Sequence, residues 1–126
     1  MSKSPQKLGK VQLRIMQFLW ERKQATARET TEEIAKSGPL AHSTAQTLLR
    51  KLEAKGAITH LVEDRIFVFR PLYREDEVTA TATSDLLKRV FQGSVYGLVS
   101  HLLKHERVSM EEMSRIRELI EKEDRR

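Results

Sequence analysis

The segment at residues 43–56, STAQTLLRKLEAKG, limits the fold of this chain more than any other. Its apolar residues recur at i, i+3, i+4 and i+7, the spacing of a helix with one face packed on a core. They are Ala45, Leu48, Leu49 and Leu52. Gly56 follows at once and is typical of the glycine that ends a helix. The opposite face carries short hydrogen-bonding side chains and two cations instead of the usual mixture of acids and bases, which indicates a partner other than water.

Two helices are expected before this segment. The first begins near Gly9, a tolerated N-cap, and continues through the run VQLRIMQFLW, which indicates a mostly buried helix. The second begins at the capping sequence TARE and ends near Ser37, because Gly38 and a proline follow. Its clearest core candidates are Ile34 and Ala35.

Two segments rich in β-branched and aromatic residues, AITHLV and IFVFR, follow Gly56. The sequence EDR separates them and Pro71 ends the second, so we expect a β-hairpin with Asp64 in its turn. Three helices followed by a hairpin is the order of a winged helix-turn-helix domain. In such a domain the third helix enters the major groove of DNA and the hairpin forms the wing.

The polar face of the predicted third helix suits the major groove. Short hydroxyls permit close approach, Gln pairs with adenine, the Thr methyl meets the thymine methyl, and Arg pairs with guanine. Cations further along the helix and at the wing tip suit phosphates. We therefore expect base contacts from Ser43, Thr44, Gln46, Thr47 and Arg50, and phosphate contacts from Lys51, Lys55 and Arg65.

The same polar face is compatible with roles that involve no base reading. Ser43 and Gln46 also fit a capping box, which would occupy both side chains with backbone groups. A polar face with two cations is also common on a solvated surface. The charge distribution favours nucleic acid, because residues 1–72 hold 13 Lys and Arg against 7 Asp and Glu, net +6, whereas residues 73–126 hold 10 against 11, net −1. The alternative is a winged-helix interaction module that docks an acidic protein partner, although such surfaces favour aromatic anchors.

From Arg74 onward the sequence predicts three helices. About 50 residues in short helices bury little core alone, so their apolar faces need another surface. A second copy of the chain would cover them and pair two recognition helices; folding back on the N-terminal domain is the alternative. The expected fold is mainly α with a small β-hairpin, with a winged-helix DNA-binding domain at residues 1–72 and a helical dimerisation domain at residues 73–126. The expected dimer contacts are Leu87, Val90, Phe91, Val95, Leu98, Val99, Leu102, Ile116 and Ile120.

Enzymatic, metal and membrane functions find little support. The chain has no cysteine, which excludes disulfides and thiolate nucleophiles, and it has no phosphate loop or G-x-S-x-G motif. His101 and His105 are spaced to share a metal ion, but no third ligand accompanies them. No apolar run approaches a membrane span, and no secretion signal is present. We expect a cytoplasmic protein with no enzymatic activity, cofactor, metal or membrane partner, and no small-molecule inducer is evident.

The sequence resembles the penicillinase-repressor family, the BlaI/MecI type of bacterial winged-helix regulators. The resemblance rests on LRIMQFLW, STAQTLLRKLEAKGAI, EDRIFVFRP and FQGSVYGLVSHLL, and it covers nearly the whole chain. It implies a homodimer that binds a dyad-symmetric operator and represses transcription. The direct contacts that it implies are Thr44, Gln46, Thr47 and Arg50, with Ser43 close by.

The chain also departs from that family. Ala41-His42 stands where the family often has a capping Ser-Pro, and Asp64 stands where the wing usually has a glycine. In the best-known members a sensor protease cuts an Asn-Phe bond in the dimerisation region, where this chain has His101-Leu102. The C-terminal cysteine motif of the copper-responsive relatives is absent, because the chain has no cysteine.

Overall fold

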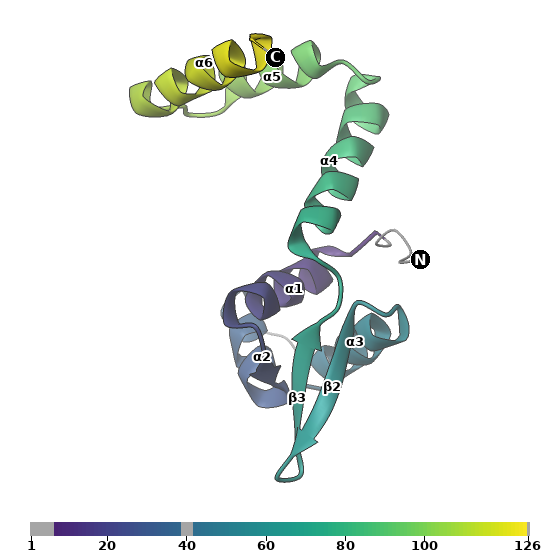
Figure 1. Cartoon of the computed structure of the whole chain (residues 1–126). Coiled ribbons are helices and arrows are strands. Elements are labelled where there is room, and N and C mark those ends of the chain that lie inside the picture. Colours follow the sequence, from purple (N-terminus) through teal and green to yellow (C-terminus); the bar gives the residue numbers. More distant parts are fainter. Residues whose placement is uncertain (1–6, 39–41, 126) are drawn as a thin grey trace. The chain divides into compact units, whose positions relative to one another are not determined.

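The structure is a computed structural model that describes residues 7–38 and 42–125. Its elements, in chain order, are α1 (Lys10–Arg22), β1 (Ala25–Thr26), α2 (Ala27–Ala35), α3 (His42–Ala54), β2 (Ile58–Glu63), β3 (Ile66–Pro71), α4 (Glu75–Phe91), α5 (Val95–His105) and α6 (Met110–Asp124) (Figure 1). The predicted order of three helices, a hairpin and three more helices is confirmed, and so is the mainly α fold class. The sequence did not indicate the short strand β1.

The chain divides into two compact units, Met1–Ser84 and Asp85–Arg126, and the division falls inside α4. The first unit therefore holds the three N-terminal helices, the sheet and the first part of α4. The second holds the rest of α4 with α5 and α6. The functional boundary expected after residue 72 coincides with the end of the wing, and it stays a prediction.

The core of the first unit lies where α1, α2 and α3 pack against the sheet. Ile15, Met16 and Leu19 of α1 are fully buried there. Leu49 and Leu52 of α3 meet them in the same cluster. Each helix presents one apolar face to a common centre, which is why hydrophobic spacing identified these helices in the sequence.

The buried residues of α2 differ in part from those predicted. Ile34 is buried as predicted, but Ala35 is exposed, so the prediction for that residue was wrong. The second buried position is Thr30, one turn before Ile34, and its hydroxyl donates to the Thr26 carbonyl at 2.9 Å. This bond pairs the buried hydroxyl of Thr30, and a pattern of apolar residues cannot reveal such a buried polar position.

Side-chain caps fix where the helices begin. The Glu29 N–H donates to Thr26 Oγ1 at 3.0 Å and the Thr26 N–H donates to Glu29 Oε1 at 2.8 Å, which confirms the predicted capping box of α2. The bond from the Thr26 N–H is also the main cause of the lowered pKa of Glu29. The Gly9 N–H donates to Gln12 Oε1 at 3.0 Å at the start of α1, and the Ser109 hydroxyl caps α6.

The strands form one antiparallel sheet in the order β1-β3-β2. Within the hairpin, His60 pairs with Phe69 and Glu63 pairs with Ile66. On the other edge of β3, β1 places Ala25 opposite Phe69. Two residues are too few to show the alternation by which a strand is recognised, so β1 could not be predicted.

Candidate nucleic-acid interface

Helix α3 turns an apolar face to the core and a polar face outward. The predicted apolar stripe is confirmed, because Ala45, Leu49 and Leu52 are buried and Leu48 is partly buried against the core. The polar residues between positions 43 and 51 are all exposed: Ser43, Thr44, Gln46, Thr47, Arg50 and Lys51. The fold thus brings the predicted base-reading residues together on one exposed side of a single helix.

The start of α3 bears on the choice between capping and base reading. The helix already includes His42, so Ser43 lies in its first turn and not at the N-cap position. Within residues 7–38 and 42–125, no partner accepts from or donates to the side chains of Ser43 and Gln46. The capping box proposed for this pair is not formed among those residues, and both side chains are available to bases. The predicted departure at Ala41 lies outside the described residues.

Thr47 is the one base-reading candidate with a hydrogen bond inside the helix. Its hydroxyl donates to the Ser43 carbonyl at 2.9 Å. Such a bond uses the hydroxyl hydrogen and leaves the oxygen lone pairs and the methyl group exposed. Thr47 can therefore accept a hydrogen bond from a base amino group or contact a thymine methyl, but it does not donate while the bond persists.

Gly56 ends α3 as predicted, with a φ of 81°. The Gly56 N–H donates to the Glu53 carbonyl at 3.0 Å, and the Ala57 N–H donates to the Leu52 carbonyl at 2.9 Å. These two bonds make a Schellman motif, in which the last carbonyls of a helix are satisfied by the residues after it. Ala57 is fully buried, so the chain returns to the core and enters β2 without a loop.

A side-chain link joins α3 to the wing. His60 Nδ1 on β2 lies 2.5 Å from Glu53 Oε2 on α3. The imidazole also stacks on the ring of Phe67 of β3, with centroids 4.3 Å apart. The link fixes the position of the wing relative to α3. Sequence reasoning missed it, because the three residues come from different elements.

The two lysines at the end of α3 differ in their surroundings. Lys55 Nζ donates to Gln12 Oε1 at 3.2 Å and to the Lys7 carbonyl at 3.3 Å, both near the start of α1. A phosphate contact from Lys55 would compete with these bonds. Lys51 is exposed and has no side-chain partner within the described residues, so its charge is available to a phosphate.

The wing ends in a two-residue turn. Asp64 and Arg65 have φ values of 50° and 67°, and a type I′ hairpin turn requires both to be positive. Asp visits this conformation more readily than most residues, which accounts for a tight turn without glycine. The predicted turn residue is therefore confirmed, and Arg65 is exposed at the tip of the wing.

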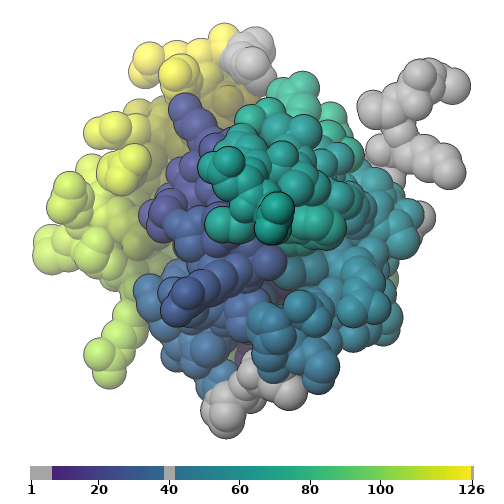
Figure 2. Space-filling model, turned by 90° about the horizontal axis from the view of Figure 1, so that it is seen from below, coloured from purple at the N-terminus to yellow at the C-terminus, as the bar shows by residue number. Residues whose placement is uncertain are grey.

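A shallow cavity lies beside the polar face of α3. It has a volume of about 530 Å³, and its lining includes Arg28 and Thr31 of α2, His42 and Gln46 of α3, and Ile66 of β3. Figure 2 shows the face on which α2, α3 and the wing lie together. Sequence reasoning missed Arg28 and His42. Position was the available signal, because the helix before a recognition helix crosses the DNA backbone.

The second unit exposes most of its apolar side chains. No residue of α5 or α6 is buried. Of the predicted dimer contacts, Val90, Val95, Val99, Leu102 and Ile120 are exposed, and Leu87, Phe91, Leu98 and Ile116 are partly buried. Tyr96 and Met110, which were not predicted, are 83% and 90% exposed. Exposure of so many large apolar side chains is typical of a region that another protein surface covers.

His101 and His105 lie one turn apart on α5, and their rings stack with centroids 4.1 Å apart. The described residues contain no group of three or more side chains placed to hold a metal ion. In the same part of the chain, no helix combines the length and the apolar character needed to cross a bilayer.

Comparison with known proteins identifies relatives along the whole chain. The sequence profile of the penicillinase repressor family matches residues 8–122. The penicillinase repressor of Bacillus licheniformis is 28% identical over 126 residues, which is 100% of this chain and 98% of the relative. The methicillin resistance regulatory protein MecI of Staphylococcus aureus is 26% identical over 108 residues, 86% of this chain and 88% of the relative.

Solved structures of the repressor BlaI are similar to the first unit of this chain. The DNA-binding domain of the repressor BlaI superposes with a TM-score of 0.53 at 32% identity, covering 61% of this chain and 93% of that domain. The monomeric form of Bacillus licheniformis BlaI in complex with the blaP half-operator gives a TM-score of 0.52 at the same identity and coverage. The profile match includes α1, the recognition helix, the wing and most of α6. This chain belongs to the penicillinase repressor family, whose members are transcriptional repressors and not enzymes.

Proposed function

We propose that this chain is a sequence-specific DNA-binding transcriptional repressor that acts as a homodimer on a dyad-symmetric operator in the cytoplasm. The observation that carries the proposal is the exposed polar face of α3, where Ser43, Gln46 and Arg50 stand beside one another without partners among the described residues. The similarity to a repressor whose solved structure includes a half-operator supports DNA as the partner of this face.

Base reading falls to the N-terminal part of α3. Ser43 and Thr44 are small enough to let the helix lie close to the floor of the major groove. Gln46 can pair with an adenine, and Arg50 can pair with a guanine or reach a phosphate. Thr47 contributes its methyl group and an accepting oxygen, since its hydroxyl hydrogen is already used.

Phosphate contacts position this helix. Lys51 follows the base-reading residues, Arg65 stands at the wing tip, and Arg28 lies in the first turn of α2. These three cations come from α3 itself, the wing and α2, so they can hold the DNA backbone on either side of the groove. The link between Glu53 and His60 keeps the wing in place for its part in the contact.

Homodimerisation accounts for the second unit. Its α5 and α6 bury no residue within their own chain, although they carry large apolar side chains such as Val95, Leu102 and Ile120. A two-fold partner would cover the apolar faces of both copies with the same surface. It would also hold two recognition helices about 34–36 Å apart, one turn of DNA, or a multiple of that distance, which matches a dyad-symmetric site.

The test is selection of bound fragments from a genomic library at near-physiological salt, followed by titration of the selected site. We expect a dyad-symmetric sequence and an affinity that falls steeply with salt. Arg50→Ala should weaken binding to the selected site by about 1–3 kcal/mol and relax the preference at one base position. Arg74→Ala is the matched control, because Arg74 is exposed and pairs with Asp76 outside α3.

Equal affinity for every duplex would contradict sequence-specific repression. A stable complex with an acidic protein and no selected fragment would favour the interaction module instead. An unchanged base preference in Arg50→Ala would remove Arg50 from the reading face while leaving the other residues of α3 in place.

A further inference from the structure

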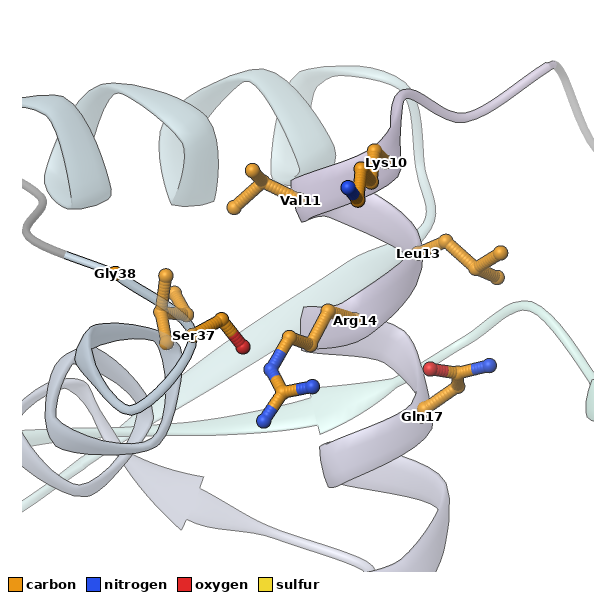
Figure 3. Close-up of a pocket in the computed structure, with 8 residues that line it drawn as sticks. Lys10, Val11, Leu13, Arg14, Gln17, Ser37 and Gly38 are labelled. Atoms are coloured by element: carbon orange, nitrogen blue, oxygen red, sulfur yellow. The ribbon is translucent and has the colours of Figure 1, made fainter.

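A cavity of about 440 Å³ lies between α1 and the end of α2 and shares no residue with the polar face of α3 (Figure 3). Its volume is within the range of small-molecule sites. Helix α1 contributes Lys10, Val11 and Arg14, and the end of α2 with the turn after it contributes Ile34 and Ser37. The lining therefore combines two cations and a hydroxyl with branched apolar side chains.

Arg14 contributes the one buried polar atom of this cavity that lacks a partner among the described residues. Its Nε is buried, yet no atom of the described residues accepts its hydrogen bond. Leaving a buried donor of a charged group unpaired is costly, and folded proteins rarely do so. Figure 3 shows the Arg14 guanidinium extending from α1 across the cavity toward the hydroxyl of Ser37. The Nε itself is covered, but Arg14 as a whole is only partly buried, so the rest of its guanidinium borders the space between the two helices.

The carboxylate of Glu33 does not fill this role. Glu33 accepts a hydrogen bond from Lys36 Nζ at 2.9 Å, and this bond is the main cause of the lowered pKa of Glu33. The positive charge of Arg14 lowers that pKa further, but the Arg14 side chain donates no hydrogen bond to Glu33. Lys10 is exposed, and it too has no ion-pair partner within the described residues. Positive charge in the cavity is therefore only partly balanced by the protein.

We propose that this cavity binds a small amphipathic organic carboxylate. One carboxylate oxygen accepts from the terminal guanidinium nitrogens of Arg14 in a charge-assisted bond, and Lys10 supplies a second positive charge. The Ser37 hydroxyl is placed to donate to the other oxygen. The body of the ligand, aliphatic or aromatic, covers Val11 and Ile34, which an inorganic anion would leave uncovered.

The position of the cavity gives binding a consequence for DNA. The cavity joins α1 to Ser37 and Gly38, the last described residues before α3. A ligand that bridges them restrains the packing of α1 against α2, and because α2 also packs against α3, it changes operator affinity. This consequence rests on the proposed function, whereas ligand binding does not, so each is measured separately.

The experiment is a titration of the full-length ¹⁵N-labelled protein followed by NMR. The probes are hexanoate and benzoate, their neutral isosteres hexanamide and benzamide, and inorganic phosphate. The direct readout is the resonance of the Arg14 Nε–H, together with the backbone amides of residues 10–17 and 34–38. We expect both acids to shift these signals saturably, with dissociation constants on the order of millimolar, as befits ligands of fewer than about ten heavy atoms.

The amides and phosphate should bind at least about tenfold more weakly, because each lacks either the charge or the apolar body. Arg14→Gln should weaken binding of the acids about tenfold or more, and Lys10→Gln by a smaller factor. Arg74→Gln, which removes an exposed cation of the same unit, should change nothing. Amide spectra of each variant show whether it is folded.

Equal binding of acids and amides would overturn the proposal, and so would acid binding that survives Arg14→Gln in a folded variant. Absence of saturable shifts with both acids would overturn it as well. Operator titration with and without benzoate then tests the effect on DNA. An unchanged operator affinity would refute that effect alone.

Discussion

Gly56→Ala tests the geometry that joins the recognition helix to the wing. The φ of Gly56 is 81°, and a Cβ built there meets nothing within 4 Å. The cost of the substitution is therefore backbone strain without a steric clash. An L-residue in the left-handed conformation costs about 1–2 kcal/mol relative to glycine. Two hydrogen bonds of the Schellman motif depend on this conformation, so the residue cannot relax to negative φ without losing them.

We expect the free energy of unfolding to fall by about 1–2 kcal/mol in Gly56→Ala. A destabilisation of that size lowers the Tm by about 4–8 °C per kcal/mol in a domain of 60–100 residues. Chemical denaturation monitored by circular dichroism measures the free energy, and calorimetry measures the Tm. Gly56→Asn is the control, because asparagine adopts positive φ more readily and should recover part of the loss.

A loss below about 0.5 kcal/mol in Gly56→Ala would refute this reasoning, since strain at a forced positive φ cannot be that small. Equal losses for alanine and asparagine would refute it too, because they would point to the side chain and not to the backbone. Operator affinity measured well below the Tm should change little in either variant, since position 56 is not on the polar face of α3.

Substitutions in α3, in the cap of α2 and in α5 test the interface, the cap and the second unit. Thr47→Ala should relax base preference by about 1–3 kcal/mol at one position, whereas Lys51→Ala should weaken binding to all sequences and reduce the salt slope by about 1, as competition titrations would show. Thr26→Ala should lower the free energy of unfolding by about 1 kcal/mol. The Thr26 N–H holds the pKa of Glu29 below its unfolded value, so this stability is present above that value and is lost as pH falls through the folded pKa. In Glu29→Gln the free energy of unfolding should fall less as the pH is lowered through this range. The same pH dependence as in the unchanged protein would contradict the cap. Val99→Glu should convert the proposed dimer to a monomer in analytical ultracentrifugation while the first unit still melts cooperatively; an unchanged mass would place the interface elsewhere.

Local signals in the sequence predicted the fold well. Apolar spacing identified the buried side of α3, the sequence TARE identified the start of α2, and Gly56 identified the end of α3. Each of these signals acts within about one turn of the chain, where side chain and backbone interact directly. The polar face of α3 was predicted for the same reason, because it is the complement of a regular apolar stripe.

Long-range features could not be predicted. The bond between Glu53 and His60 joins residues whose neighbourhood depends on how β2 packs beside α3. The bonds from Lys55 to the start of α1 likewise depend on tertiary packing and change what that lysine can do. Thr30 occupies a core position at which hydrophobic spacing would predict an apolar residue. It can be buried there because its hydroxyl donates to the Thr26 carbonyl. In the first two cases the deciding partner lies in another element, whereas Thr30 bonds four residues back and was missed because hydrophobic spacing counts only apolar side chains.

Trp20 is the single tryptophan of the chain. Its Nε1–H donates at 2.9 Å to the carbonyl of Tyr73, two residues before α4 begins. Indole emission responds to hydrogen bonding and to solvent at that nitrogen, so the protein carries an intrinsic fluorescent reporter at the point where the winged helix is joined to α4. The wavelength of its emission distinguishes events that detach this junction from events confined to α5 and α6, without any label.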